Sequence, residues 1–192
     1  MTRFSQFFPL LLLAVLASLT FWLDQAVQQD TPGNGEERHD PDYIVEKIVA
    51  HRMDANGDVK HTLYADRMTH YPDDDTTDLI SPRFISNASV RTPMSITSRT
   101  ARISSGGENI YFETDVRATR AAYDDHSEMV MKTSFLHVIP DEHIARTDRP
   151  VTVTDAHTVA HAIGLELNSE TRTVKFLSQF KGTYHDPDRV RR

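Results

Sequence analysis

The chain has no cysteine among its 192 residues. Disulfide bonds, thiolate metal sites and cysteine nucleophiles are therefore excluded, and the absence suits an oxidising compartment without requiring one. Glycine is also scarce, at seven residues. The adjacent pair Gly106 and Gly107 does not form a glycine-rich loop of the kind that cradles phosphates.

An excess of basic residues is missing as well. The 21 lysines and arginines are outnumbered by 28 acidic residues, which gives a net charge of −7. No basic stripe stands out, so the composition argues against a nucleic-acid-binding protein. Arg189, Arg191 and Arg192 lie in residues 187–192, which we interpret as a basic, solvated tail.

Motifs for catalysis are not found either. No serine lies in a Gly-x-Ser-x-Gly motif, and no set of nucleophile, base and orienting acid can be picked out. We therefore predict that the protein is not an enzyme, has no catalytic residues and needs no cofactor. An envelope hydrolase is the weakest of the functional hypotheses.

The sequence offers weak candidates for a metal site. The run Asp73–Asp75, followed by Asp78, carries the oxygen ligands that calcium prefers. Three adjacent carboxylates on an extended loop rarely converge on one ion, so a solvated loop is favoured. His157 and His161 are four residues apart, but in a β pattern they would not share a helical face. We predict no metal site.

One long segment has no charged side chain, from Phe4 to Leu23. About 20 helical residues cross a hydrocarbon core of roughly 30 Å, so residues 1–24 are predicted to form a transmembrane anchor. Arg3 precedes the segment and Asp24 follows it, which predicts a cytoplasmic N-terminus. Cleavage as a signal peptide after residues 15–17 is the less favoured alternative, and it leaves the rest of the chain in the same compartment.

Beyond the anchor, residues 25–42 are polar and turn-rich and read as a flexible linker. From Tyr43 onward the apolar period is two, and no convincing helix follows. Residues 43–186 are therefore predicted to form one all-β domain, an antiparallel sandwich or roll. The five prolines of this domain before residue 151 are expected at strand ends or edges, because proline cannot donate to a sheet ladder; they are Pro72, Pro82, Pro93, Pro140 and Pro150.

The alternation assigns a set of apolar side chains to the inward faces of the strands. Ordinarily such residues form a closed core, and the pattern alone does not distinguish a core from a ligand groove. The set is Leu63, Ala65, Phe84, Ile96, Ile103, Ile110, Phe112, Met129, Met131, Leu165, Val174 and Phe176.

The order of anchor, polar linker and β-only domain resembles that of the lipopolysaccharide transport family LptC. Local sequences support the resemblance. The closest matches are residues 145–153 (ARTDRPVTV) and 162–167 (AIGLEL), with weaker ones at 63–66, 70–71, 79–82, 96–101 and 110–112. Asp115 and Met94 depart from the glycine and tryptophan that members often carry nearby. These departures affect local details of one turn and one groove wall.

The resemblance implies an incompletely closed antiparallel β-jellyroll in the periplasm, tethered to the inner membrane by a single span. It implies that the inward side chains given above line a groove for the acyl chains of lipopolysaccharide. It also implies two protein partners, the permease subunits of an inner-membrane ABC transporter and an LptA-like periplasmic bridge protein. The partner edges would be the first strand, with Tyr43, Val45 and Val49, and the last strand, with Phe180 and Tyr184.

Two functional hypotheses follow. In the first, the protein accepts lipopolysaccharide extracted by the transporter and passes it along the groove to the bridge protein. In the second, it is a structural adaptor of an envelope complex with a closed core and no lipid cargo.

Overall fold

The computed structural model describes residues 4–28, 39–87, 93–124, 126–171 and 173–185. The chain divides into two units, Met1–Glu37 and Arg38–Arg192, and each is described by itself. Most of the expected linker, residues 29–38, and the basic tail lie outside the described residues.

The described residues of the first unit form the helix α1 (Phe4–Gln28). Its segment Pro9–Ala26 has a mean hydropathy of 1.6 and is long and apolar enough to cross a membrane. The helix continues four residues past Asp24. The Ser18 hydroxyl donates to the Ala14 carbonyl at 2.8 Å and that of Thr20 to Leu16 at 2.9 Å. These hydroxyls are therefore satisfied within the helix, which suits an apolar surrounding.

The described residues of the second unit form one antiparallel sheet of eleven strands. The strands are β1 (Tyr43–Met53), β2 (Val59–Tyr71), β3 (Thr76–Ile80), β4 (Arg83–Ser86), β5 (Met94–Thr97), β6 (Thr100–Ile103), β7 (Ile110–Arg120), β8 (Met129–Ile139), β9 (Ile144–Thr154), β10 (Thr158–Asn168) and β11 (Thr173–Tyr184). A short 3-10 turn, Ser105–Gly107, connects β6 and β7.

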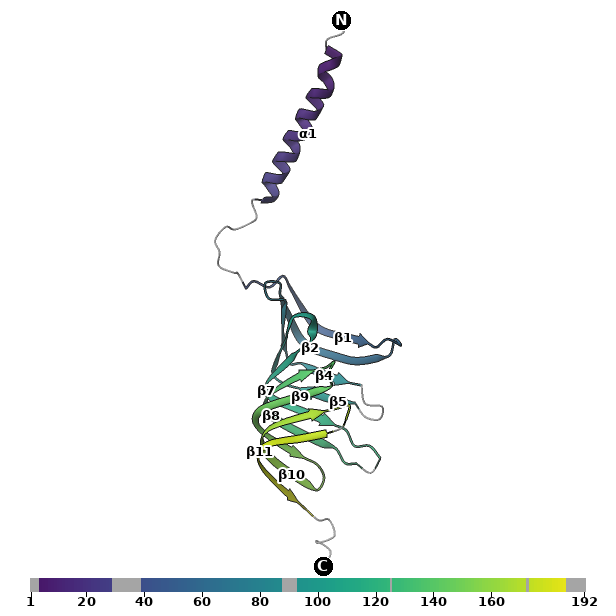
Figure 1. Ribbon diagram of the computed structural model, residues 1–192, viewed down its shortest axis with the longest axis vertical. Coiled ribbons are helices and arrows are strands. Elements are labelled where there is room, and N and C mark those ends of the chain that lie inside the picture. The colour runs from purple at the N-terminus through teal and green to yellow at the C-terminus, as the bar shows by residue number, and fades with distance from the viewer. Residues whose placement is uncertain (1–3, 29–38, 88–92, 125, 172, 186–192) are drawn as a thin grey trace, which may run out of the picture. The chain divides into compact units, whose positions relative to one another are not determined.

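The strands follow one another across the sheet in chain order. β3 and β4 are two parts of one interrupted strand, since both pair with β2, through residues 67–71 and 61–64 respectively. β5 and β6 are likewise two parts of one strand, since both pair with β7. The domain is therefore an antiparallel meander, with β1 and β2 at one end and β10 and β11 at the other (Figure 1).

Irregularities in successive strands lie opposite one another and form a line across the sheet, here called the fold line. Left-handed backbone occurs at Ser81 (φ 52°), at Thr114 and Asp115 (φ 60° and 56°) and at Gly164 (φ 80°). The line is continuous from Ser81 to Thr114, because the Ser81 amide donates to the Arg99 carbonyl and the Arg99 amide donates to the Thr114 carbonyl, both at 2.9 Å. Such irregularities bend a sheet sharply.

The fold line divides the sheet into two halves. The β4–β5 half comprises β4, β5 and the parts of the long strands in register with them, and the β3–β6 half comprises the remainder. The inner faces of the two halves pack together: Phe84 of the first lies with its ring 6.4 Å from that of Phe112 of the second. The sheet is thus folded on itself without closing into a barrel, as the family resemblance implied.

A closed core lies between the two halves. Phe112 and Leu136 are completely buried, and Leu79, Val116 and Leu165 are 1% exposed. Burial of such a side chain contributes about 1.5–3 kcal/mol each. This packing stabilises the folded domain, and it occupies only part of the inner surface of the sheet.

One expectation about proline was wrong. Pro150 lies inside β9, opposite Ile163 of β10, and not at a strand end or an outer edge. It is tolerated because the register between β9 and β10 shifts directly beside it, between Ile163 and Leu165. Pro82 also lies on the fold line, between β3 and β4.

Candidate functional site

A cavity of about 480 Å³ opens between the two halves. Its volume falls within the range of about 300–1,000 Å³ that is typical of small-molecule sites. Residues from β2, β4, β5 and β7 to β11 line it, together with the segment between β7 and β8. The site is therefore built by the same fold that closes the core.

One wall of the cavity is a single row of paired residues in the β4–β5 half. His61 pairs with Ser86, Ser86 with Met94, Met94 with Arg120, and Arg120 with Met129. All five line the cavity, because directly paired residues of antiparallel strands point to the same face of the sheet. This wall carries both polar and apolar groups.

The facing wall is a second row, in the β3–β6 half, and it is entirely apolar. Val138 pairs with Ala145, Ala145 with Leu167, and Leu167 with Val174. All four line the cavity. The cavity therefore has an aliphatic wall opposite a wall that carries three polar side chains, those of His61, Ser86 and Arg120.

The interior extends from this cavity toward the core. A second cavity of about 20 Å³ shares Met94, Ile96 and Met129 with the first and reaches Met131 and Leu136. Methionine is unbranched and flexible, so these side chains can adapt to an irregular apolar ligand. They are the part of the wall best able to enlarge the cavity.

The structure places the twelve inward side chains expected from the sequence in different surroundings. Seven belong to the buried core: Ala65, Phe84, Ile96, Ile110, Phe112, Met131 and Leu165. Leu63, Ile103 and Phe176 are partly buried and pack against that core. Of all twelve, only Phe84, Ile96, Met129 and Val174 line the large cavity. Val174 is 38% exposed and lies at its rim.

His61 is a cavity residue that the sequence analysis missed. It is 5% exposed, and its ring stacks on that of Phe84 at 5.2 Å. Neither ring nitrogen has a hydrogen-bond partner among the described residues. Burial, together with the charges of Lys60 and Arg52, lowers the pKa of His61 to about 4, so the ring is neutral at pH 7. The alternation of β2 provided the signal, since His61 has the same parity as Leu63 and Ala65.

Arg120 is the second polar residue that the sequence analysis missed. It continues the inward series of Val116 and Ala118 on β7. Its guanidinium donates from Nη2 to the Ser127 carbonyl at 3.2 Å and lies 5.1 Å from the centre of the Tyr123 ring. Its buried Nε has no partner among the described residues. The guanidinium is thus held in place while its buried Nε–H stays unpaired among the described residues.

An ionic bridge connects the two halves beside the cavity. Arg52, at the end of β1, donates to Asp141 in the β8–β9 turn at 2.9 Å, and Lys60 Nζ lies 3.5 Å from the same carboxylate. Asp141 is adjacent to Pro140, which lines the cavity. Although partial burial opposes it, the hydrogen bonds and charges of Arg52 and Lys60 hold the pKa of Asp141 below its ordinary value.

The two outermost strands carry exposed apolar side chains. β1 pairs only with β2 and β11 only with β10 among the described strands. The partner residues expected from sequence are exposed there, from 37% for Val45 to 68% for Tyr184. Tyr43, Val49 and Phe180 are 45%, 52% and 59% exposed. Unpaired edges of this kind readily accept another strand.

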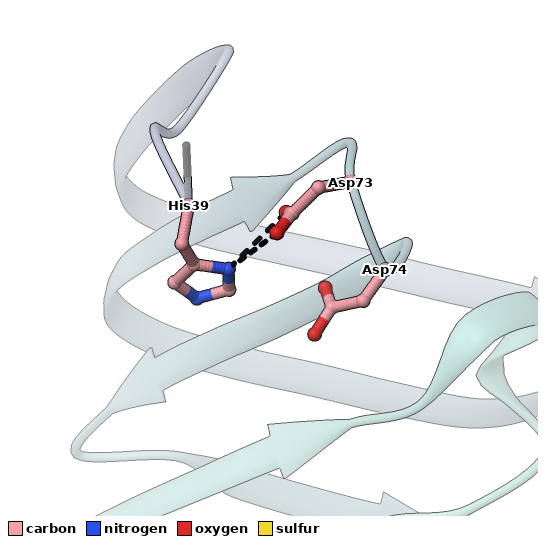
Figure 2. A group of neighbouring side chains, drawn as sticks. All are labelled: His39, Asp73 and Asp74. Carbon is pink, nitrogen blue, oxygen red and sulfur yellow. Dashed lines mark hydrogen bonds and ion pairs between the residues drawn. The ribbon is translucent and has the colours of Figure 1, made fainter. Parts of the chain in front are cut away.

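The acidic run of the β2–β3 turn does not converge on one point. Asp73 lies 2.9 Å from His39, which raises the pKa of that histidine, and Figure 2 shows Asp74 beside this pair. Ligand atoms of these three exposed residues lie within 4.8 Å of one another. Asp75 instead accepts from Ser105 at 2.7 Å and lies 3.1 Å from His70. The run is therefore shared among several local contacts that order the turn.

The folded, incompletely closed sheet with an apolar interior defines a β-jellyroll. The chain belongs to the LptC-related lipopolysaccharide-assembly family, whose model matches residues 10–185. Family and apolar helix together indicate a single-pass membrane protein with a periplasmic domain that serves lipopolysaccharide transport.

A solved structure supports the fold independently. It is LptH, described as the LptA-homologous periplasmic component of the lipopolysaccharide transport device of Pseudomonas aeruginosa. The match has a TM-score of 0.53 and 7% identity, and covers 66% of this chain and 95% of the other. At this identity the likeness concerns the fold alone. A comparison with curated proteins found no match.

Proposed function

We propose that this protein accepts lipopolysaccharide from an inner-membrane ABC transporter and passes it, through the interior of the folded sheet, to a periplasmic bridge protein of similar fold. The observation that carries the proposal is the cavity of about 480 Å³ between the two halves, with its aliphatic wall. Each CH₂ group kept out of water is worth about 0.8 kcal/mol, so acyl chains need such a lining to cross an aqueous space.

The two exposed edges support a relay. A jellyroll that pairs with β11 would extend the sheet, and its interior would continue the interior of this domain. Main-chain hydrogen bonds would supply the affinity and exposed side chains such as Phe180 and Tyr184 the specificity. We assign β1 to the transporter and β11 to the bridge protein, in agreement with the resemblance.

The anchor sets the compartment in this proposal. Arg3 before the apolar segment and Asp24, Asp30 and Glu36 after it favour a cytoplasmic N-terminus and a periplasmic domain. The N-terminus would then lie in the cytoplasm, the helix in the membrane and the jellyroll in the periplasm.

Photo-crosslinking in cells tests the proposal. A photoreactive amino acid at Val174 or Met129, which line opposite walls of the cavity, is expected to capture lipopolysaccharide. Two exposed residues are the matched controls. Lys175 lies next to Val174 on β11, and Lys132 lies three residues from Met129 on β8. Little or no lipid adduct is expected at these two positions.

Dependence on the transporter separates transport from passive binding. In a reconstituted system, adducts at Val174 should increase when the ABC transporter hydrolyses ATP. Equal labelling at Val174 and Lys175, or no lipid adduct at any position, would contradict the proposal. The second result would favour the structural adaptor with a closed interior.

A further inference from the structure

The polar groups of the cavity are not explained by an acyl-chain lining alone. His61 is 5% exposed and has two ring nitrogens without a partner among the described residues, and Arg120 has an unpartnered buried Nε. Buried polar groups are normally paired, because leaving them unpaired costs free energy of folding. A wall meant only for hydrocarbon would be expected to carry apolar residues at both positions, as the facing wall does.

Both residues belong to the same row and border the same space. His61 and Arg120 are separated by two intervening strands, with Ser86 and Met94 between them in the row. Three strand spacings of about 4.8 Å put their Cα atoms roughly 14 Å apart. A ligand group that meets both must therefore be wide and polar, and must lie along this row rather than at one point.

The donor set indicates the chemistry of that group. An arginine has donors and no acceptors, and its planar guanidinium suits phosphate oxygens. The Nη2 contact to Ser127 and the ring of Tyr123 hold the guanidinium at this wall, and a rotation of the side chain would let its buried Nε–H donate to a ligand oxygen. A neutral His61 ring supplies one further donor and one acceptor. Asp124 is the one carboxylate among the described residues that line the cavity.

We propose that Arg120 and His61 form a head-group subsite that binds the phosphorylated polar part of the cargo while the aliphatic wall takes its acyl chains. This inference rests on the proposed function, since it names the orientation of the lipid in the same cavity. Lipopolysaccharide lies with its phosphorylated head toward the β4–β5 half and its chains toward Val138, Ala145, Leu167 and Val174.

The test compares two lipids on the full-length protein in lipid nanodiscs. Binding of purified lipopolysaccharide and of the same material after chemical removal of its phosphates is measured for four proteins. These are the wild type, Arg120→Met, His61→Phe and the double variant. The substitutions keep length or ring shape and remove the donors.

The wild type is expected to prefer the phosphorylated lipid by about tenfold or more. Each single variant should reduce this preference and the double variant should abolish it. Affinity for the dephosphorylated lipid should stay within about twofold of wild type, which also shows that the cavity is still folded. Arg117→Met is the matched control, since Arg117 is exposed on the same strand, and it should leave the preference unchanged.

Several results would overturn the subsite. The first is a wild type without preference for the phosphorylated lipid, and the second is variants that lose both lipids equally. The third is a loss of preference in Arg120→Met but not in His61→Phe, which would exclude His61 from the subsite. Displacement of the lipid by inorganic phosphate alone would indicate a free-anion site. Failure of the wild type to bind either lipid would instead contradict the proposed function.

Discussion

Arg52 and Asp141 are 89 residues apart in sequence, yet they form a hydrogen-bonded ion pair at 2.9 Å. The pair joins the end of β1 to the β8–β9 turn and so connects the two halves of the folded sheet. Both side chains are 50% exposed, so the contribution of the pair to stability is small, about 0–1 kcal/mol. Because the pair lies beside the cavity, we expect it to hold the two halves together over the site and to contribute little to the stability of the fold.

Asp141→Asn is expected to speed the entry of lipid with little effect on stability. The variant loses the charge that attracts Arg52 and Lys60, so the halves separate more easily beside the cavity. We expect a several-fold faster association of a fluorescent lipopolysaccharide and a change in unfolding free energy below about 1 kcal/mol. Stopped-flow fluorescence and chemical denaturation measure the two quantities. Glu142→Gln removes a carboxylate from the same turn and should change neither; an unchanged rate in Asp141→Asn would exclude a closing role.

The stability of the domain should fall as the pH is lowered from about 6.5 to 4. The folded-state pKa of His61 is about 4 and its ordinary value is 6.5, so in this range only the unfolded chain takes up the proton. The difference corresponds to about 3 kcal/mol, lost progressively through that window and constant below it. Denaturation curves recorded at a series of pH values measure the loss.

His61→Phe isolates this contribution, because it should remove most of the pH dependence in the same window and leave the smaller part due to His137, whose pKa is also lowered by burial. His39 and His70 do not obscure the effect. Their pKa values are raised, so the stability they add is lost above pH 6.5 and is complete below it. Lowered carboxylate pKa values, as at Asp75 and Asp141, act mainly below pH 4. The same pH slope in wild type and His61→Phe would show that the histidine is not buried in solution.

Gly164→Ala should destabilise the domain more than Gly57→Ala. Both glycines have positive φ, 80° and 87°, so alanine costs about 1–2 kcal/mol of backbone strain at either position. At Gly164 a Cβ atom would in addition lie 2.8 Å from Leu177 Cδ1, whereas at Gly57 nothing lies within 4 Å. We expect the difference between the two variants to exceed about 1 kcal/mol in urea denaturation. Equal losses would mean that β10 and β11 shift apart freely at the fold line.

The two sheet edges should serve different partners. Phe180→Lys, on β11, is expected to weaken capture of an LptA-like bridge protein about tenfold or more, since it replaces an exposed apolar contact with a charge. Val49→Lys, on β1, is the matched change on the opposite edge and should leave bridge capture intact. Affinity measurements with purified bridge protein and co-purification of the transporter permease distinguish the two. If both variants lose the same partner, the edge assignment is wrong.

The sequence predicted the fold class, and seven of the twelve side chains assigned to inward faces belong to the buried core, because alternation is a local property. Ile110 and Phe112, for example, were assigned to an inward face, and both are buried. The expectation that prolines lie at strand ends or edges was wrong for Pro150. Pro82 and Pro150 both lie at the fold line, so proline in this domain accompanies a bend of the sheet.

The cavity could not be predicted in the same way. On β10 the buried residues Ala162 and Leu165 are three apart, because the left-handed Gly164 reverses the alternation between them. A period of two assumes a straight strand and does not reveal such a reversal. Whether an inward residue lies in the core, as Phe112 does, or at the cavity, as Val174 does, depends on its distance from the fold line and on which residues face it from the other half.

The meander has one further consequence. Because the strands are laid down in chain order, position in the sequence from Tyr43 to Tyr184 is also position along the domain. The direction from transporter to bridge protein in the proposed relay is therefore the direction from N-terminus to C-terminus. Lengthening the route would require only additional hairpins after β11, and shortening it only their removal, without rewiring any existing strand pair. A protein built in this way encodes the length of its lipid path directly in the length of its chain.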